Sequence, residues 1–289
     1  MSTDRPGSTG DAGPAAATPP AGLAGTNGSP GRVALVTGAA RGIGAATVRA
    51  LADRGWSVVA VDRGADDPRL PYRLGTEAEL HAVAAGAADR IRAVVADVTD
   101  EAGLAAAVGV AEEAFGGLDA AVAVAGVIAG GRPLWEMPRE QVDAVLDVDL
   151  GGVLTLARVA VPALLRRPEP RQGRFLAVAS AGATRGLPLL AAYCAAKAGV
   201  TGLIRALAVE LGDTGVTANA ISPGSTETAM LTESARLYGL GSARDFAATQ
   251  PVRRLLAAGE IAAALVWLAG EDSSAVTGAT LAVDGGLAL

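Results

Sequence analysis

Short runs of β-branched and other apolar residues alternate with longer Ala- and Leu-rich segments from Arg32 onward. The first segments read RVALVTG, GAATVRALADRG and SVVAVD, a strand-length run, a helix-length run and a second strand-length run. This alternation predicts βαβ units, in which a parallel sheet carries helices on both faces. Strands are expected at 32–38, 57–62, 91–98, 118–126, 173–180, 215–222 and 279–286.

Helices are expected in the gaps between the strands, at 44–55, 100–116, 138–166, 191–212 and 259–269. No internal repeat of fixed period interrupts this order. Strands and helices that alternate in this way are typical of a doubly wound α/β domain of the Rossmann type. We therefore expect a single domain over residues 32–289, with a seven-stranded parallel sheet between two helical layers.

The first 31 residues differ from the rest, because they consist largely of Gly, Pro, Ala, Ser and Thr and contain no aromatic residue. Such a segment buries too little apolar surface to offset its conformational entropy, so we expect a disordered tail. It lacks the basic start and apolar run of a signal peptide, and no uninterrupted apolar run reaches about 18 residues. A soluble, cytoplasmic protein is expected.

Composition narrows the classes of partner. The 289 residues are 51% hydrophobic, which suffices for one large core. The net charge of −6 does not favour binding to nucleic acid or to an anionic membrane surface. The single cysteine, Cys194, excludes a disulfide framework, and with the single histidine, His81, it leaves no pattern for a metal site. A small-molecule substrate is the remaining default.

The turn after the first expected strand reads TGAARGIG, with glycines at 38, 42 and 44. Glycines there permit a tight turn and let backbone N–H groups approach a pyrophosphate at a helix N-terminus, although such a turn can also be purely structural. Asp62 ends the second strand, where a carboxylate accepts hydrogen bonds from an adenosine ribose or else caps the next turn. The guanidinium of Arg41 can pair with a phosphate, so this residue favours NADP, which carries a 2′-phosphate. Because Asp62 repels that phosphate, NAD is favoured over NADP.

Tyr193 and Lys197 stand four residues apart in the apolar run AAYCAAKAGV. On a helix, residues with this spacing share a face, so the phenol and the ammonium lie side by side. A core-facing helix gains nothing from such a pair. A lysine ammonium favours the phenolate form of a neighbouring tyrosine, which turns a weak base into a usable general acid/base.

Together these motifs resemble the short-chain dehydrogenase/reductase family. The resemblance rests on TGAARGIG, on ADV at 96–98, on AVAG at 123–126, on Ser180 thirteen residues before Tyr193, on Tyr193-x-x-x-Lys197, and on SPGSTET at 222–228. It runs from about Arg32 to the end of the chain. It implies a soluble oxidoreductase of the Rossmann fold that interconverts an alcohol and a ketone.

The resemblance also implies roles for individual residues. Tyr193 is the general acid/base, Lys197 holds the nicotinamide ribose, and Ser180 holds the substrate oxygen. Asp97 contacts the adenine with Val98 beside the ring, unless it only caps the following helix, and Thr228 lies at the nicotinamide carboxamide. The cofactor-binding residues implied are Gly38, Arg41, Gly42, Ile43, Gly44, Asp62, Asp97, Val98, Ala125, Gly126, Tyr193, Lys197, Pro223, Gly224, Thr226 and Thr228.

Two positions depart from the family pattern. Where the family has Asn-Asn-Ala-Gly, this chain has Ala123-Val124-Ala125-Gly126, which we expect to alter packing and not cofactor binding. Asp149 occupies the place of the fourth catalytic residue, asparagine. A carboxylate near Lys197 raises the pKa of the lysine and offsets its effect on Tyr193. We expect an active enzyme with its pH optimum shifted upward, and Asp149 as part of the catalytic set.

The 34 residues between Asp62 and Asp97 exceed what a helix crossover needs. The stretch DDPRLPYRLGTEAEL resembles the insertion of the mycofactocin-dependent, carveol-dehydrogenase-like branch of the family. That resemblance implies that the insertion covers the adenosine side, that NAD is held without exchange, and that a mycofactocin-type redox carrier reoxidises it. The alternative is a plain surface loop on a dehydrogenase whose NAD exchanges freely.

The segment after SPGSTET is apolar, with Met230, Leu231, Leu237, Tyr238 and Leu240, which is consistent with a small or medium hydrophobic alcohol or ketone. By resemblance, helix packing between subunits gives a homotetramer. Two alternatives stay open. One is an NADPH-dependent reductase of the 3-oxoacyl-carrier-protein type, and the other is a dinucleotide-binding regulator that has lost its chemistry.

Overall fold

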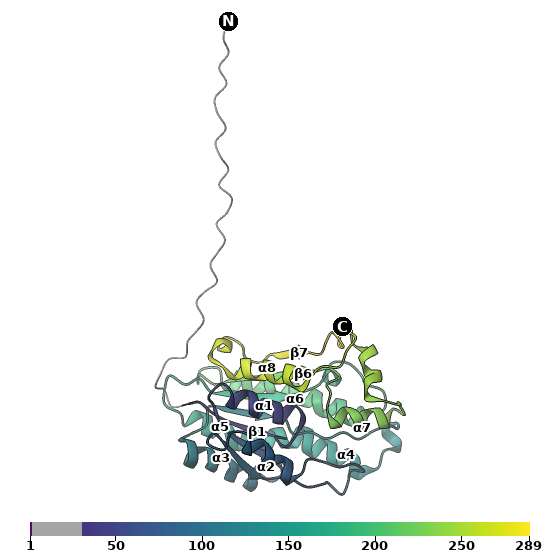
Figure 1. Ribbon diagram of the computed structural model, residues 1–289, viewed down its shortest axis with the longest axis horizontal. Coiled ribbons are helices and arrows are strands. Elements are labelled where there is room, and N and C mark those ends of the chain that lie inside the picture. Colours follow the sequence, from purple (N-terminus) through teal and green to yellow (C-terminus); the bar gives the residue numbers. More distant parts are fainter. Residues whose placement is uncertain (2–30) are drawn as a thin grey trace. The chain divides into compact units, whose positions relative to one another are not determined.

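Seven parallel strands form a single sheet at the centre of the domain (Figure 1). The computed structural model describes Met1 and residues 31–289, so the expected tail lies almost wholly outside the described residues. The strands are β1 Val33–Thr37, β2 Ser57–Asp62, β3 Ile91–Val95, β4 Ala120–Ala123, β5 Arg174–Val178, β6 Thr217–Pro223 and β7 Thr280–Val283. Six lie within the ranges that the sequence predicts, and β6 extends one residue beyond its range of 215–222.

The order of the strands is β3-β2-β1-β4-β5-β6-β7, and every neighbouring pair is parallel. The chain moves outward from β1 to β3 and then returns to place β4 on the other side of β1. The predicted doubly wound topology is confirmed. At such a reversal the loops that follow the two central strands diverge and leave a crevice at their carboxyl ends.

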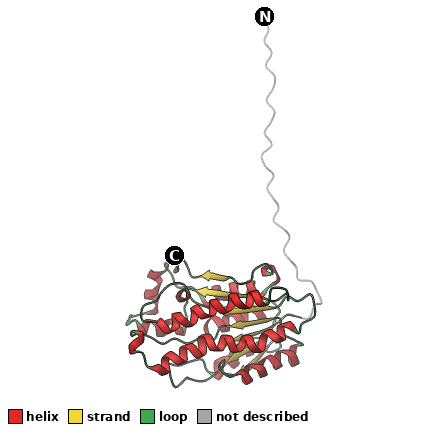
Figure 2. Ribbon diagram, turned by 180° about the vertical axis from the view of Figure 1, so that it is seen from behind, coloured by secondary structure: helices red, strands yellow, loops and turns green. Residues whose placement is uncertain are grey.

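Helices cover both faces of the sheet (Figure 2). They are α1 Gly42–Ala52, α2 Glu77–Ala85, α3 Glu101–Phe115, α4 Arg139–Leu146, α5 Gly152–Leu165, α6 Ala191–Glu210, α7 Ala229–Leu237 and α8 Ala258–Ala269. One core cluster joins α1, α2 and α8 to the sheet, and a second joins α3, α4, α5 and α6 to its other face. Because both faces are covered, β1, β4, β5 and β6 are buried along their whole length.

The prediction of one continuous helix over 138–166 was wrong in an important detail. A π-helical turn, Asp147–Gly151, separates α4 from α5. Such turns insert one extra residue into a helix and often lie at functional sites. Gly152 follows the turn, and a Cβ atom there would approach Val98 Cγ2 to 2.5 Å. The turn carries Asp149.

Helix α2 lies within the long insertion and is not among the helices that the sequence predicts. Its N-cap is a capping box: the Thr76 hydroxyl accepts from Glu79 N at 3.2 Å, and the Glu79 carboxylate accepts from Thr76 N at 2.8 Å. These reciprocal bonds satisfy donors that the first helical turn leaves free. Residues 63–76 are therefore the true loop of the insertion, and we call them the strap.

Two helical stretches, Arg139–Leu165 and Ala191–Glu210, are long and apolar enough to cross a membrane by length and composition alone. Half of the apolar window of the first and 44% of that of the second are buried inside the domain. Both stretches pack against the sheet, as the core helices of a soluble α/β fold do.

Candidate active site

A cavity of about 770 Å³ opens at the carboxyl ends of the strands, around the reversal between β1 and β4. The predicted site residues that line it are Gly38, Arg41, Gly42, Ile43, Gly44, Asp62, Asp97, Val98, Ala125, Gly126, Ser180, Tyr193, Lys197, Pro223, Gly224, Thr226 and Thr228. The remaining predicted residue, Asp149, is fully buried behind the wall beside Gly126. One cavity thus unites residues from seven segments of the sequence.

The glycine turn brings bare backbone to the cavity. Gly38 and Gly42 have φ angles of +68° and +58°, a region that favours glycine. A Cβ atom on Gly44 would overlap the carbonyl oxygen of Gly38, and one on Gly38 would lie 2.7 Å from Ala125 Cα. Helix α1 begins at Gly42, so its N-terminus faces the same space. This cradle fits the pyrophosphate of a dinucleotide.

The segment 123–126, where the family has Asn-Asn-Ala-Gly, is bonded to the end of β1. The Thr37 hydroxyl accepts hydrogen bonds from Val124 N at 3.2 Å and Ala125 N at 3.3 Å. These bonds link the end of β1 to the segment that follows β4, although the asparagine side chains of the family are missing there. The backbone at Ala125 and Gly126 still lines the cavity.

Asp62 caps the turns around it, which is one of the two interpretations that the sequence allowed, and its contact with an adenosine ribose stays a prediction. Its carboxylate accepts from Ala40 N at 3.0 Å and from Gly64 N at 3.2 Å, and it also lines the cavity. Arg41 turns toward the strap, where its Nη2 donates to the carbonyl oxygen of Arg73 at 2.8 Å. The guanidinium that favoured a 2′-phosphate is therefore engaged by the strap.

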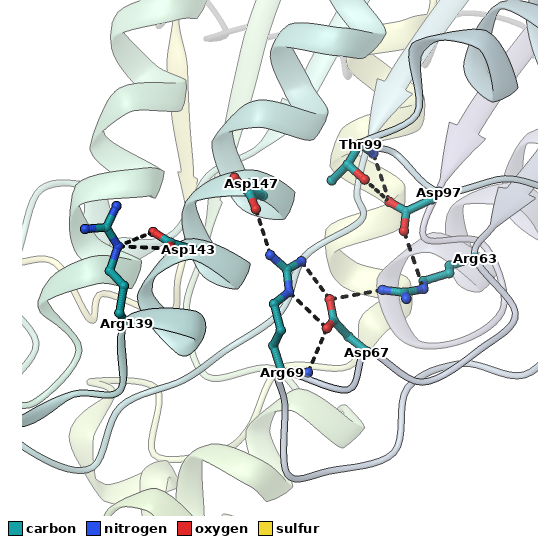
Figure 3. A network of polar contacts seen from close by, with 8 residues as sticks. All are labelled: Arg63, Asp67, Arg69, Asp97, Thr99, Arg139, Asp143 and Asp147. Atoms are coloured by element: carbon teal, nitrogen blue, oxygen red, sulfur yellow. Dashed lines mark hydrogen bonds and ion pairs between the residues drawn. The ribbon is translucent and has the colours of Figure 1, made fainter.

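The first half of the strap is organised around Asp67, which is 1% exposed (Figure 3). Its Oδ2 atom lies 3.0 Å from Arg63 Nη1 and 2.8 Å from Arg69 Nη2. Arg69 also pairs with Asp147 at 2.7 Å, and Arg63 lies 3.4 Å from Asp97. Hydrogen bonds from Arg69, opposed by burial, hold the pKa of Asp67 down to about 2. The network ties the strap to the π-helical turn and to the end of β3.

The second half of the strap crosses to β4. The Tyr72 hydroxyl accepts a hydrogen bond from Ile128 N at 2.8 Å, and burial raises the pKa of this phenol. Tyr72, Leu74 and Gly75 line the cavity. Sequence reasoning placed the insertion over the adenosine side without identifying these residues. Their signal was weak, because only the spacing of opposite charges in DDPRLPYR pointed to internal pairing.

Ser180, Tyr193 and Lys197 meet in the middle of the cavity, and each is at most 9% exposed. Ser180 follows β5, and its Oγ accepts from Gly182 N at 3.0 Å. Tyr193 and Lys197 lie one turn apart on α6, with Nζ 5.7 Å from the centroid of the phenol ring. Nζ also donates to the carbonyl oxygen of Val178 at 3.2 Å.

The electrostatics of the centre contain opposing effects. Burial raises the pKa of Tyr193, and the nearby Asp149 adds to this increase. The Lys197 ammonium and a hydrogen bond with Ser180 act in the opposite direction and favour the phenolate. The net result is a raised pKa for Tyr193, because burial outweighs the effect of the Lys197 ammonium that the sequence predicts to favour the phenolate.

Asp149 lies under this centre with 0% exposure. Its Oδ1 atom accepts from Val127 N at 2.7 Å, and its Oδ2 atom lies 3.5 Å from Lys197 Nζ. That distance suits an ion pair and is too long for a well-formed hydrogen bond, and Oδ2 has no hydrogen-bond partner within residues 31–289. Burial raises the pKa of Asp149, whereas Lys197 and the Val127 N–H lower it.

The far end of the cavity is apolar, with Leu187, Leu190, Met230, Tyr238 and Phe246 in its wall. The Tyr238 hydroxyl donates to the carbonyl oxygen of Pro188 at 2.6 Å, and its ring meets Phe246 edge-on at 5.9 Å. Tyr238 and Leu240 line this end as expected, whereas Leu237 lies outside it. The segment after SPGSTET begins as helix α7, with Thr228 as its N-cap.

One residue that supports the cavity wall, Gln250, was not predicted from the sequence. Gln250 is 1% exposed, and its side chain accepts from Ser225 N at 2.8 Å and donates to the carbonyl oxygen of Arg254 at 2.6 Å. Gly224 packs against the same amide, with no room for a Cβ atom. Gln250 therefore fixes the loop after β6, which supplies Gly224 and Thr226 to the cavity.

The fold and the site together place a dinucleotide cradle beside a buried serine, tyrosine and lysine. The sequence model of the family described as enoyl-(acyl carrier protein) reductase matches residues 38–288. The chain is similar to cis-4-hydroxycyclohexanecarboxylate dehydrogenase of Sinomonas cyclohexanicum, with 39% identity over 88% of this chain and 96% of that protein. It is also similar to D-threitol dehydrogenase of Mycolicibacterium smegmatis, with 37% identity over 89% and 92%.

Among solved structures, carveol dehydrogenase from Mycobacterium avium in complex with NAD has a TM-score of 0.84 and 32% identity over 89% of this chain and 97% of that chain. The 3-ketoacyl-(acyl-carrier-protein) reductase from Brucella melitensis, complexed with NADH, has a TM-score of 0.79 and 32% identity over 90% and 99%. The chain belongs to the short-chain dehydrogenase/reductase family. It is an oxidoreductase of alcohols and ketones, and its cofactor is NAD.

Proposed function

We propose that this enzyme interconverts a small or medium hydrophobic secondary alcohol and its ketone, with Tyr193 as the general acid/base. The observation that carries the proposal is the position of Tyr193 and Ser180 at the junction of two parts of one cavity. On one side lies the glycine cradle with Asp62, and on the other lies the apolar wall around Tyr238. A carbinol carbon held at this junction faces both the cofactor and the base.

In the oxidative direction, Ser180 holds the substrate oxygen by a hydrogen bond and the Tyr193 phenolate takes the hydroxyl proton. When bound, NAD⁺ supplies the electron sink by accepting a hydride from the carbinol carbon. Lys197 stabilises the phenolate and reaches the nicotinamide ribose. Asp62 accepts from the adenosine ribose, Asp97 and Val98 flank the adenine, and Thr228 contacts the carboxamide.

We further propose that NAD(H) stays bound between turnovers and is reoxidised by a mycofactocin-type carrier. The support is the strap, which lines the cavity and is anchored at separate points to Arg41, Asp97, Asp147 and Ile128. Release of the dinucleotide past the strap requires several of these contacts to break together. A cytoplasmic homotetramer completes the proposal, by resemblance to the family.

Extensive dialysis of the purified protein tests the retention of the cofactor. Near-stoichiometric NAD(H) in the supernatant after heat denaturation, with turnover only when an artificial electron acceptor is present, is the expected result. Protein that emerges empty and reduces added NAD with a secondary alcohol overturns the retention and the carrier. The alcohol dehydrogenase itself would then stand as an ordinary, freely exchanging enzyme.

The two alternative functions have weaker support. An NADPH-dependent 3-oxoacyl-carrier-protein reductase needs a cation for the 2′-phosphate, yet Arg41 is bonded to the strap and Arg63 is paired with two carboxylates. Comparison of turnover with NADH and NADPH tests it. A non-catalytic regulator leaves the buried Ser180, Tyr193 and Lys197 unexplained, and it requires that Tyr193→Phe change no measured function.

A further inference from the structure

The carboxylate of Asp149 is unusual because it is wholly buried and only half satisfied. One oxygen atom accepts from Val127 N, whereas Oδ2 has no hydrogen-bond partner in the described part of the chain. An asparagine in this place would direct an N–H₂ group, a donor, to the position of one of these oxygens. The structure therefore holds a vacant acceptor in a site where polar atoms are costly to leave unpaired.

The nearest proton donor to this vacant acceptor is the Lys197 ammonium, 3.5 Å away. Tyr193 lies one helical turn from Lys197, and Tyr72 of the strap is the remaining titratable group close enough for Asp149 to raise its pKa. Tyr72 faces Asp149 from the strap, and Tyr193 and Lys197 face it from α6. Lys197 thus lies next to both groups, with Nζ 5.7 Å from the centroid of the Tyr193 ring and 3.5 Å from Oδ2 of Asp149.

We infer that Asp149 stores the proton that alcohol oxidation releases, so that the closed site retains it until the cofactor is reoxidised. This inference rests on the proposed function. The hydroxyl proton passes to the Tyr193 phenolate, Lys197 passes one of its ammonium protons to Oδ2 of Asp149, and the lysine is reprotonated from Tyr193. The products are a ketone, a reduced cofactor and a neutral Asp149, with Tyr193 and Lys197 returned to their starting charges.

Charge balance in the buried site explains why retention is favourable. The oxidised nicotinamide ring carries a positive charge, and reduction removes it. If the proton leaves for solvent, the buried site changes by one charge, which is costly in a medium of low dielectric constant. If Asp149 is protonated in the same turnover, the net charge stays constant. The burial of Asp149, which favours the neutral carboxyl, acts in the same direction.

A proton count on the NAD⁺-loaded protein tests this inference. In one turnover with a secondary alcohol and no electron acceptor, cofactor reduction is followed by absorbance and proton release by an indicator dye in weak buffer at neutral pH. The wild type is expected to release well under one proton per cofactor reduced, and Asp149→Asn a full proton. Asp119→Asn removes a carboxylate that pairs with Arg167, far from the site, and should behave as the wild type. A full proton from the wild type overturns the inference.

An infrared comparison of the wild-type protein loaded with NADH and with NAD⁺ needs neither a substrate nor a stable variant. The NADH form should carry the carbonyl band of one additional protonated carboxyl group, and Asp119→Asn should retain this band. Its absence overturns the proton store. Failure of every alcohol to reduce the bound cofactor overturns the proposed function instead, and the infrared result still decides the state of Asp149.

Discussion

The two ends of the cavity are closed in different ways. At the adenosine end, the strap is tied down by charged side chains around Asp67 and by the bond between Tyr72 and Ile128. At the substrate end, an apolar wall is held by fewer directional contacts, the bonds from Tyr238 to Pro188 and from Arg185 to Leu287. Directional contacts must break as a set, whereas apolar packing is non-directional and tolerates rearrangement. The difference is consistent with the proposal that the cofactor stays bound while the substrate exchanges.

The largest effect is expected from a substitution at Tyr193, which lies between the two ends of the cavity. Tyr193→Phe removes the acid/base and keeps the ring, so kcat for a secondary alcohol should fall by about 10²–10⁴-fold. The dinucleotide should remain bound, because the adenosine end is untouched. Steady-state kinetics and the NAD(H) content after dialysis measure the two effects. Unchanged turnover would remove Tyr193 from the chemistry.

Asp67→Asn should loosen the adenosine end alone. The variant leaves Arg63 and Arg69 without their shared carboxylate, and we expect the dissociation rate of NAD(H) to rise roughly 10- to 100-fold, since about 1–3 kcal/mol is typical for a lost charged partner. Alcohol turnover with an artificial electron acceptor and excess NAD should change little. Asp143→Asn is the matched control, because its pair with Arg139 is exposed on α4 and drawn beside the network in Figure 3. A dissociation rate equal to that of the control contradicts the role of the strap.

The same carboxylate predicts an acid limit for the closed state. The pKa of Asp67 is held at about 2, below its ordinary value of 3.8, so its ionised form stabilises the fold fully above about pH 4. Protonation as the pH falls toward 2 removes about 1–2 kcal/mol, because both partner arginines are partly exposed. Cofactor retention and the unfolding free energy should decline together in this range, and Asp67→Asn should lack this component. A retained component in the variant would assign the loss to other carboxyl groups.

Asp149→Asn should shift the pH dependence of catalysis without abolishing activity. Because the carboxylate raises the pKa of Tyr193, its removal should populate the phenolate at lower pH. The rising limb of the pH profile of kcat/KM for alcohol oxidation should move down by about one pH unit or less, the size of a single neighbouring charge. Asp119→Asn should leave the limb in place. An unchanged limb in Asp149→Asn contradicts the electrostatic account of the catalytic set.

The smallest effects compare two tyrosine hydroxyls, one at each end. Tyr72→Phe loses the bond from Ile128 N and should accelerate the release of NAD(H) by about fivefold, with little change in the KM of the substrate. Tyr238→Phe loses the bond to Pro188 and should raise the KM of the substrate by a similar factor without affecting release. If both variants change the same parameter, the two ends are not independent.

Local patterns predicted the sheet and the cofactor cradle well. The strand at 57–62 and the glycines of TGAARGIG are defined by neighbouring residues, so their structure can be derived without knowledge of the rest of the chain. The pairing of Arg69 with Asp147 joins residues 78 positions apart, and no local pattern specifies it. The π-helical turn at Asp147–Gly151 is missed for a similar reason, because residues 138–166 read in the sequence as one continuous helix. The roles of the site residues stay predictions until the variants are made.

The π-helical turn determines how the chain would respond to the deletion of a single residue between α4 and α5. Each residue of an α-helix advances the side chains by about 100°, so one extra residue between α4 and α5 sets the two helices out of phase. Deleting a single residue from 147–151 would give a straighter rod with more regular backbone hydrogen bonds, and it would also rotate α4 against its neighbours. Asp149 would then face away from Lys197, and Asp147 away from Arg69. A more regular helix would cost the molecule both its proton store and one anchor of its strap.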